Sequence, residues 1–168
     1  MYTPGHASHH VSLVDSGSGA LFTGDALGIH FPDVGVLRPA TPPPDIDVEL
    51  AVDSIERIRA RTESALMFSH FGPVREVDEL CGIAADRIRL WAGIVRDAMD
   101  ETDDLDRIAE ILASRTAAEF DEAGASDEAR ERYEALSSTR NNAAGLVRYW
   151  TKRREREQAA EPPAPSGS

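Results

Sequence analysis

A chain of 168 residues, 41% of them hydrophobic, is long enough to fold as one domain around a buried core. Its 30 acidic residues outnumber its 18 lysines and arginines, and the net charge of −12 would repel a phosphate backbone, which argues against nucleic-acid binding. The single cysteine excludes an internal disulfide, and the sequence shows neither a signal peptide nor an apolar run of membrane-spanning length, so we expect a cytoplasmic protein.

The first part of the chain, up to about residue 75, is rich in glycine and proline and contains short β-type runs. We predict strands at 11–15 and 20–23 around a Ser-Gly-Ser-Gly turn. The stretch that follows is predicted to be irregular, because the three consecutive prolines at 42–44 exclude helix and ladder pairing. Asp45 or Asp47 should then cap a helix that extends through Arg61, and the run "SALMFSHFG" predicts a strand that ends at Ser69 and His70.

The rest of the chain predicts helices. Apolar residues at helical spacing indicate three of them, at about 80–99, at 105–120 and from a cap at Ser126 to Trp150. Cys81 lies on the first and is interpreted as a core residue. The basic run "TKRRERE" fits the negative end of the helix dipole, and "AAEPPAPSGS" has the composition of a disordered tail.

Three residues stand out as candidate metal ligands: His6 in "TPGH", Asp25 in "FTGD" and His70 in "FSHFG". Each is placed at the end of a predicted strand and next to glycine, which allows a compact site. Two imidazoles and a carboxylate suit zinc, and also ferrous iron or manganese. Their wide spacing matches no zinc finger, so only a folded sheet would bring them together.

The ordered motifs TPGHAxxH, TGD and SHFG resemble the second half of the metallo-β-lactamase fold superfamily, and most of all its hydroxyacylglutathione hydrolase (glyoxalase II)-like hydrolases. The stretches "RPATPPP" and "NNAAGLVRYW" are similar to one of its prokaryotic branches, so that the resemblance covers residues 3–150. It implies an α/β (α+β) fold in which residues 1–75 form the C-terminal half of an αββα sandwich. Residues 76–154 would be a three-helix C-terminal extension, and residues 155–168 a disordered tail.

The resemblance also implies roles for individual residues. His6 would be the third histidine of a first zinc site, Asp25 the carboxylate that bridges two metals, and His70 the last histidine of a second site. His10 would form a hydrogen bond to a ligand residue and would not bind the metal itself. The two histidines outside this set, His9 and His30, are interpreted as loop residues. The implied reaction is hydrolysis of a small-molecule thioester, lactone or similar ester by a metal-activated water, without a protein nucleophile that we can assign.

The chain departs from the family in one respect: the His-x-His-x-Asp-His loop of the first half of the fold is absent. Each metal would therefore keep one histidine and the shared aspartate, and we expect the chain alone to be weakly active or inactive. The sheet would also lack its partner, which predicts an exposed apolar face and self-association.

Several alternatives stay open at this point. The chain could be a fragment lacking an N-terminal half, a subunit that needs another chain or itself as partner, or a degenerate remnant. Persulfide dioxygenases share the scaffold and use a single iron. A protein of another class, a non-catalytic helical interaction protein, would also explain the long amphipathic helices.

Overall fold

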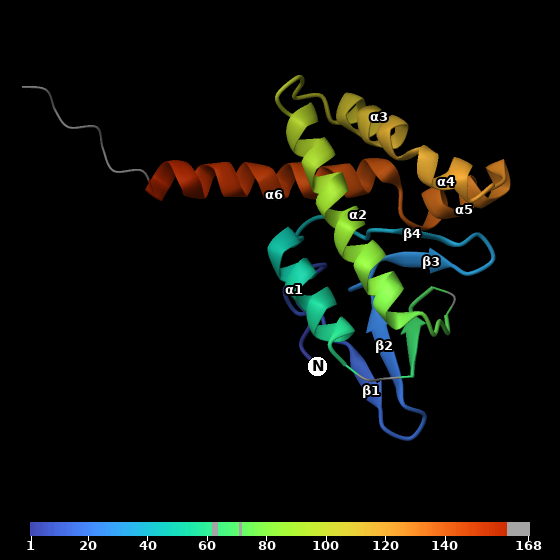
Figure 1. Ribbon diagram of the computed structural model, residues 1–168. Coiled ribbons are helices and arrows are strands. Elements are labelled where there is room, and N and C mark those ends of the chain that lie inside the picture. The colour runs from blue at the N-terminus through green and yellow to red at the C-terminus, as the bar shows by residue number, and fades with distance from the viewer. Residues whose placement is uncertain (62–63, 71, 161–168) are drawn as a thin grey trace, which may run out of the picture.

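The computed structural model describes residues 1–61, 64–70 and 72–160, and it has a mixed α/β architecture (Figure 1). Its N-terminal part contains the strands and one helix: β1 (Leu13–Asp15), β2 (Ala20–Gly24), β3 (Ile29–Phe31), β4 (Val36–Arg38), α1 (Val48–Arg59) and β5 (Ala65–Phe68). The helices α2 (Val77–Ala98), α3 (Leu105–Thr116), α4 (Ala118–Glu122), α5 (Asp127–Leu136) and α6 (Thr139–Ala160) follow. The fold class expected from the sequence is therefore confirmed.

A three-stranded sheet carries the strand-end residues of interest. β2 lies in its centre, antiparallel to β1 and parallel to β5, so that Phe22 stands opposite both Leu13 and Met67. A bridge between Tyr2 and Val11 extends the sheet beyond β1. Because β2 and β5 are parallel, the residues that follow them emerge at the same edge of the sheet.

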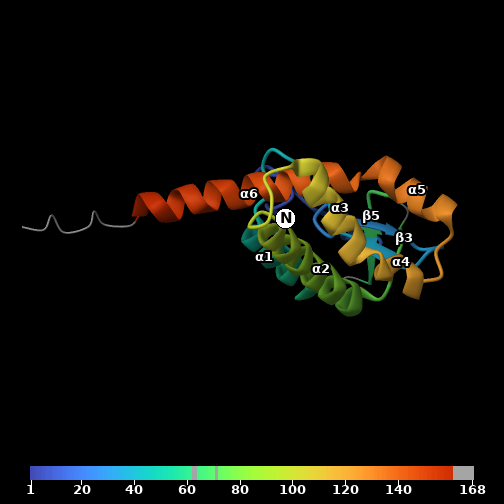
Figure 2. The same cartoon turned by 90° about the horizontal axis from the view of Figure 1, so that it is seen from above.

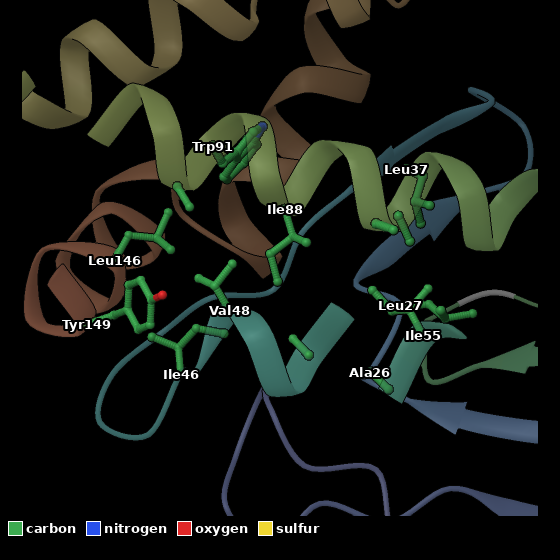
Figure 3. Packing of buried hydrophobic residues seen from close by; sticks show 14 of the residues in the cluster. Ala26, Leu27, Leu37, Ile46, Val48, Ile55, Ile88, Trp91, Leu146 and Tyr149 are labelled. Atoms are coloured by element: carbon green, nitrogen blue, oxygen red, sulfur yellow. The ribbon is translucent and has the colours of Figure 1, made fainter. Parts of the chain in front are cut away.

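One face of this sheet is covered by helices. α1 and α2 lie side by side along it (Figures 1 and 2), and Leu21 and Leu66 of the sheet are completely buried in the main hydrophobic core. Ile55 of α1 and Ile88 of α2 belong to the same core, which extends to Leu146 of α6 (Figure 3). The N-terminal strands and the later helices thus share one core.

The opposite face of the sheet is open. Because side chains alternate along a strand, Leu13, Phe22 and Met67 point away from the face that holds Leu21 and Leu66. Val11, two residues before Leu13, shares their face, and Tyr2 stands opposite Val11. Four of these side chains are exposed by 44–64% (Tyr2, Val11, Leu13 and Phe22), and Met67 is partly buried. We call these five residues the open face, and it corresponds to the exposed apolar surface expected from the sequence.

The stretch predicted to be irregular contains a β-hairpin instead. β3 and β4 pair antiparallel, and all six of their residues are buried. Phe31 and Val36 pack with Phe120 and Tyr133 in a second small core, where the Tyr133 hydroxyl donates to the Val36 carbonyl and accepts from the Phe31 N–H. The prediction of an irregular segment was wrong because the hairpin is stabilised by packing partners that lie about 100 residues further along the chain, where no local pattern reveals them.

The C-terminal part contains five helices among the described residues, where three were predicted. Ser126 caps α5 as expected, accepting from the Ala129 N–H at 3.2 Å. The helix then breaks, because Ser138 accepts from the Asn141 N–H and the carboxylate of Glu134 accepts from the Thr139 N–H. α6 continues to Ala160 and extends beyond the body of the molecule (Figure 2), so the first six residues of the expected tail are helical, and residues 161–168 lie outside the described part.

None of the described helices is both long and apolar enough to cross a membrane.

Candidate metal centre

The structure brings His6, Asp25 and His70 together. Asp25 directly follows β2 and His70 lies two residues after β5, whereas His6 lies in the loop between the bridged residues Tyr2 and Val11 and not at a strand end as predicted. The Nε2 atom of His6 is 3.6 Å from Oδ2 of Asp25, and Nε2 of His70 is 3.9 Å from Oδ1 of Asp25. Each imidazole therefore faces a different oxygen of one carboxylate.

The orientation of His6 is set by a backbone contact. Its Nδ1 atom lies 2.9 Å from the carbonyl oxygen of Ala40, which can only accept a hydrogen bond. Nδ1 therefore carries the proton in the neutral ring, and Nε2 presents its lone pair to Asp25. The loop is held close to α1 at Gly5, where a Cβ atom would lie 2.2 Å from Cα of Ala51, so that only glycine fits at this position.

The carboxylate of Asp25 lacks a donor on one side. Its Oδ1 atom is buried and has no hydrogen-bond partner among the described residues. A buried carboxylate oxygen without a donor is costly, and here the Nε2 atoms of His6 and His70 lie 3.6 and 3.9 Å from the carboxylate. A cation placed between Asp25 and the histidines would remove this cost, so the donor set fits a metal ion.

His10 accepts a hydrogen bond from the backbone of Asp25 and so helps to position it. Its Nε2 atom accepts a hydrogen bond from the Asp25 N–H at 3.1 Å, and its Nδ1 contacts the carbonyl oxygen of Thr3 at 3.1 Å. Burial lowers the pKa of His10, which favours the neutral ring that can accept this bond. Gly24 has φ +57°, and a Cβ there would lie 2.4 Å from Nε2 of His10, so the glycine makes room for the ring.

The other two histidines lie outside the cluster. His9 is exposed in the N-terminal loop. His30 does not lie on an irregular segment as predicted; it is 6% exposed in β3, with its ring centroid 5.5 Å from that of Phe68, and burial lowers its pKa. Its Nδ1 atom has no hydrogen-bond partner among the described residues.

A cavity of about 500 Å³ opens beside the three residues. Its second wall comes from the break between α5 and α6, with Leu136, Ser137, Ser138 and Asn141. We did not predict this wall, because the apolar spacing indicated one continuous helix from Ser126 to Trp150. The sequence Ser137-Ser138-Thr139 is the local signal that could have indicated the start of α6, because serine and threonine are favoured at helix N-caps.

The cluster is incomplete as a metal site. Two ligands of one tetrahedral zinc lie roughly 3.3 Å apart, because metal–nitrogen and metal–oxygen distances are about 2.0–2.1 Å. The separations of 3.6 and 3.9 Å are a little wider, and each joins one histidine to one carboxylate oxygen. No group of three histidine, cysteine, aspartate or glutamate side chains is arranged for metal binding within the described ranges.

Comparison with known proteins finds similarity to one superfamily over the N-terminal part of the chain. Residues 1–70 match the family model described as the metallo-beta-lactamase superfamily. Over 75 residues the chain is 44% identical to a metallo-beta-lactamase fold-containing protein of Sulfurisphaera tokodaii, a match that covers 44% of this chain and 26% of that protein. The chain thus spans about a quarter of this curated relative.

Two solved structures are similar. A metallo-beta-lactamase family protein of Thermus thermophilus aligns with a TM-score of 0.56 and 16% identity over 91% of this chain and 43% of that one. An archaeal metallo-beta-lactamase superfamily protein from Sulfolobus tokodaii aligns with a TM-score of 0.44 and 35% identity over 51% of this chain and 31% of that one. The family model and the sequence relative, together with the fold of the Thermus protein, support the metallo-beta-lactamase superfamily fold for this chain.

Proposed function

We propose that this chain carries part of the active site of a metal-dependent hydrolase that acts on a thioester, lactone or similar ester. The observation that carries the proposal is the meeting of His6 and His70 at the two oxygens of Asp25, one of which is buried without a donor among the described residues. The match of residues 1–70 to the superfamily model supports a hydrolase-type function. A glyoxalase II-like enzyme is the subtype that the sequence motifs favour.

The residues of this chain would hold and orient the metal ions. His6 and His70 each offer Nε2, Asp25 offers one oxygen to each side, and zinc is the ion that this borderline donor set suits best. When bound, zinc lowers the pKa of a coordinated water and polarises a carbonyl group. The carbonyl of Ala40 fixes the ring of His6, and His10 fixes the backbone of Asp25, which keeps the donor atoms in place.

The cavity indicates the kind of substrate. Beyond the cluster it is lined by apolar residues, among them Ile29 and Leu136, and by uncharged polar ones such as Asn141, with no lysine or arginine among the described residues of its wall. Arg140, on the neighbouring helix turn, forms an ion pair with Asp106 of α3 instead. A substrate whose acyl part is uncharged would fit this wall better than an anionic one.

Hydrolysis would require further ligands. A catalytic zinc normally has three protein ligands. This chain offers each metal only one histidine and one oxygen of Asp25. The relatives are two to four times longer than the part that this chain matches, so they hold additional polypeptide that could supply such ligands.

The test is to fuse the chain to the part of the Sulfurisphaera tokodaii protein that it does not match. We expect the fusion to contain zinc by elemental analysis and to hydrolyse lactone or thioester probes. Asp25→Ala should lose both properties, because it removes the carboxylate that faces both histidines. His9→Ala, exposed in the same loop, is the matched control and should change neither. Zinc content and turnover that survive Asp25→Ala would refute the proposal.

A further inference from the structure

Arg38 is a buried cation that the proposed function does not use. It is the last residue of β4, and only 5% of it is exposed. Its guanidinium carbon lies over two aromatic rings, 4.5 Å from the ring centroid of Trp91 and 5.0 Å from that of Phe120. Ring faces stabilise the charge, but they leave the N–H groups unpaired, because these groups lie at the edge of the guanidinium plane.

The N–H groups of Arg38 have few acceptors. Nη2 donates to Oγ1 of Thr116 at 3.5 Å, which is long for a hydrogen bond. Nε has no hydrogen-bond partner among the described residues. A buried guanidinium is costly unless its donors are paired, so this position lacks an acceptor.

The carboxylate that pairs with Arg38 is shared with a second cation. Oε2 of Glu119 lies 3.9 Å from Nε of Arg38 and only 2.8 Å from Nη1 of Arg87. Burial raises the pKa of Glu119, which disfavours its charged form. The carboxylate of Glu134 also attracts Arg38, but both of its oxygens accept hydrogen bonds from Thr139. An acceptor placed against Arg38 would therefore meet an incompletely paired cation.

A cavity of about 300 Å³ opens beside Arg38, and this volume suits a small ligand. Most of its wall is uncharged and consists of Ala113, Thr116, Ala117, Phe120 and Thr139. The second cation of the wall, Arg130, already forms an ion pair with Asp121 at 2.7 Å. The two acidic residues of the wall, Glu131 and Glu134, are exposed to solvent, which screens their charge. Arg38 is thus the buried charge of this cavity.

We infer that this cavity binds a small monocarboxylate, whose oxygens accept hydrogen bonds from the guanidinium edge of Arg38 and whose short apolar part packs against Ala117 and Phe120. A carboxylate matches the planar guanidinium and accepts two parallel hydrogen bonds. Phosphate is less favoured, because it brings more charge against an apolar wall and two glutamates. The site lies apart from the cavity beside His6, Asp25 and His70, so the inference does not rest on the proposed function.

The experiment titrates the intact chain with butyrate and follows the indole N–H signal of Trp91 by NMR, because this ring lies next to the guanidinium of Arg38. A chelator is present throughout, so that butyrate cannot bind through a metal ion. We expect a saturable shift at Trp91 and none at Trp150, whose indole donates to the Ala92 carbonyl. Butyramide, which has the same shape without the charge, and inorganic phosphate should each bind at least tenfold more weakly. The net charge of −12 repels anions in general, so saturable binding of butyrate would indicate a local site.

Variants test the position of the site. Ala113→Leu fills part of the cavity without changing a charge and should weaken butyrate binding at least tenfold. Ala118→Leu changes an exposed alanine outside the cavity wall and is the matched control, which should bind like the original chain. Arg38→Lys keeps the positive charge but loses the planar edge, so it should also weaken binding. If circular dichroism shows that Arg38→Lys does not fold, Ala113→Leu decides the question.

Three results would overturn the inference. The first is the absence of a saturable shift at Trp91. The second is binding of butyramide or phosphate as tight as that of butyrate, because the charge or the shape of the carboxylate would then not be recognised. The third is unchanged butyrate binding by Ala113→Leu, which would place the ligand outside this cavity.

Discussion

Replacing Asn142 with alanine should destabilise the protein more than the same change at its neighbour Asn141. The side chain of Asn142 is 1% exposed and joins α6 to the proline-rich segment. Its Oδ1 accepts from the Thr41 N–H at 2.6 Å, and its Nδ2 donates to Ser137 Oγ at 2.7 Å. Thr41 follows Ala40, whose carbonyl holds His6, so this bond also connects α6 with the candidate metal centre.

The size of the effect follows from these bonds. Leaving the buried Thr41 N–H without an acceptor costs about 1–3 kcal/mol and losing the bond to Ser137 about 0.5–1.5 kcal/mol, so we expect a loss of ~2–4 kcal/mol in the free energy of unfolding. Asn141→Ala removes an exposed side chain and should cost less than ~0.5 kcal/mol. Urea unfolding followed by circular dichroism measures both. Equal stability of the two variants would show that the buried amide does not connect the segments as described.

The remaining predictions concern a thiol, a glycine and a helix cap. Burial raises the pKa of the Cys81 thiol from 9.0 to about 12. Because the thiol loses its proton at a lower pH in the unfolded chain than in the folded one, the free energy of unfolding should fall as the pH rises from 9 to 12. In Cys81→Ala this fall should begin at a higher pH. A thiol reagent should label Cys81 only after unfolding. Gly24→Ala places a Cβ at 2.4 Å from His10 Nε2 at φ +57° and should cost about 1–2 kcal/mol and change the ring-nitrogen NMR signals of His10. Ser126→Ala removes the acceptor at the start of α5 and should cost ~1 kcal/mol in urea unfolding.

Local signals explain which elements could be predicted. Asp47 and Ser126 accept hydrogen bonds from the first turns of α1 and α5, and these capping positions are visible in the sequence because the cap and its partner lie three residues apart. The hairpin of β3 and β4 could not be predicted in the same way. Both strands are buried on both faces by residues distant in the chain, so they lack the alternating pattern that marks a half-exposed strand.

The candidate site was also predictable from local sequence signals and not from contacts between distant residues. The motifs pointed to His6, Asp25 and His70, because each occurs in a short recognisable sequence. The contact of His6 with the Ala40 carbonyl spans 34 positions, and no local pattern indicates it. The wall of the cavity at Ser137 and Ser138 depended on a helix break caused by capping side chains, which apolar periodicity does not reveal.

Zinc titration of the 168-residue chain by calorimetry at neutral pH tests whether Asp25 is the shared metal ligand. Asp25→Ala is compared with Asp45→Ala, which changes an exposed aspartate outside the cluster. We expect weak zinc binding that Asp25→Ala abolishes and Asp45→Ala leaves unchanged, because His6 and His70 meet at Asp25. Zinc binding that is unaffected by Asp25→Ala, or two tightly held zinc ions in the chain alone, would contradict it.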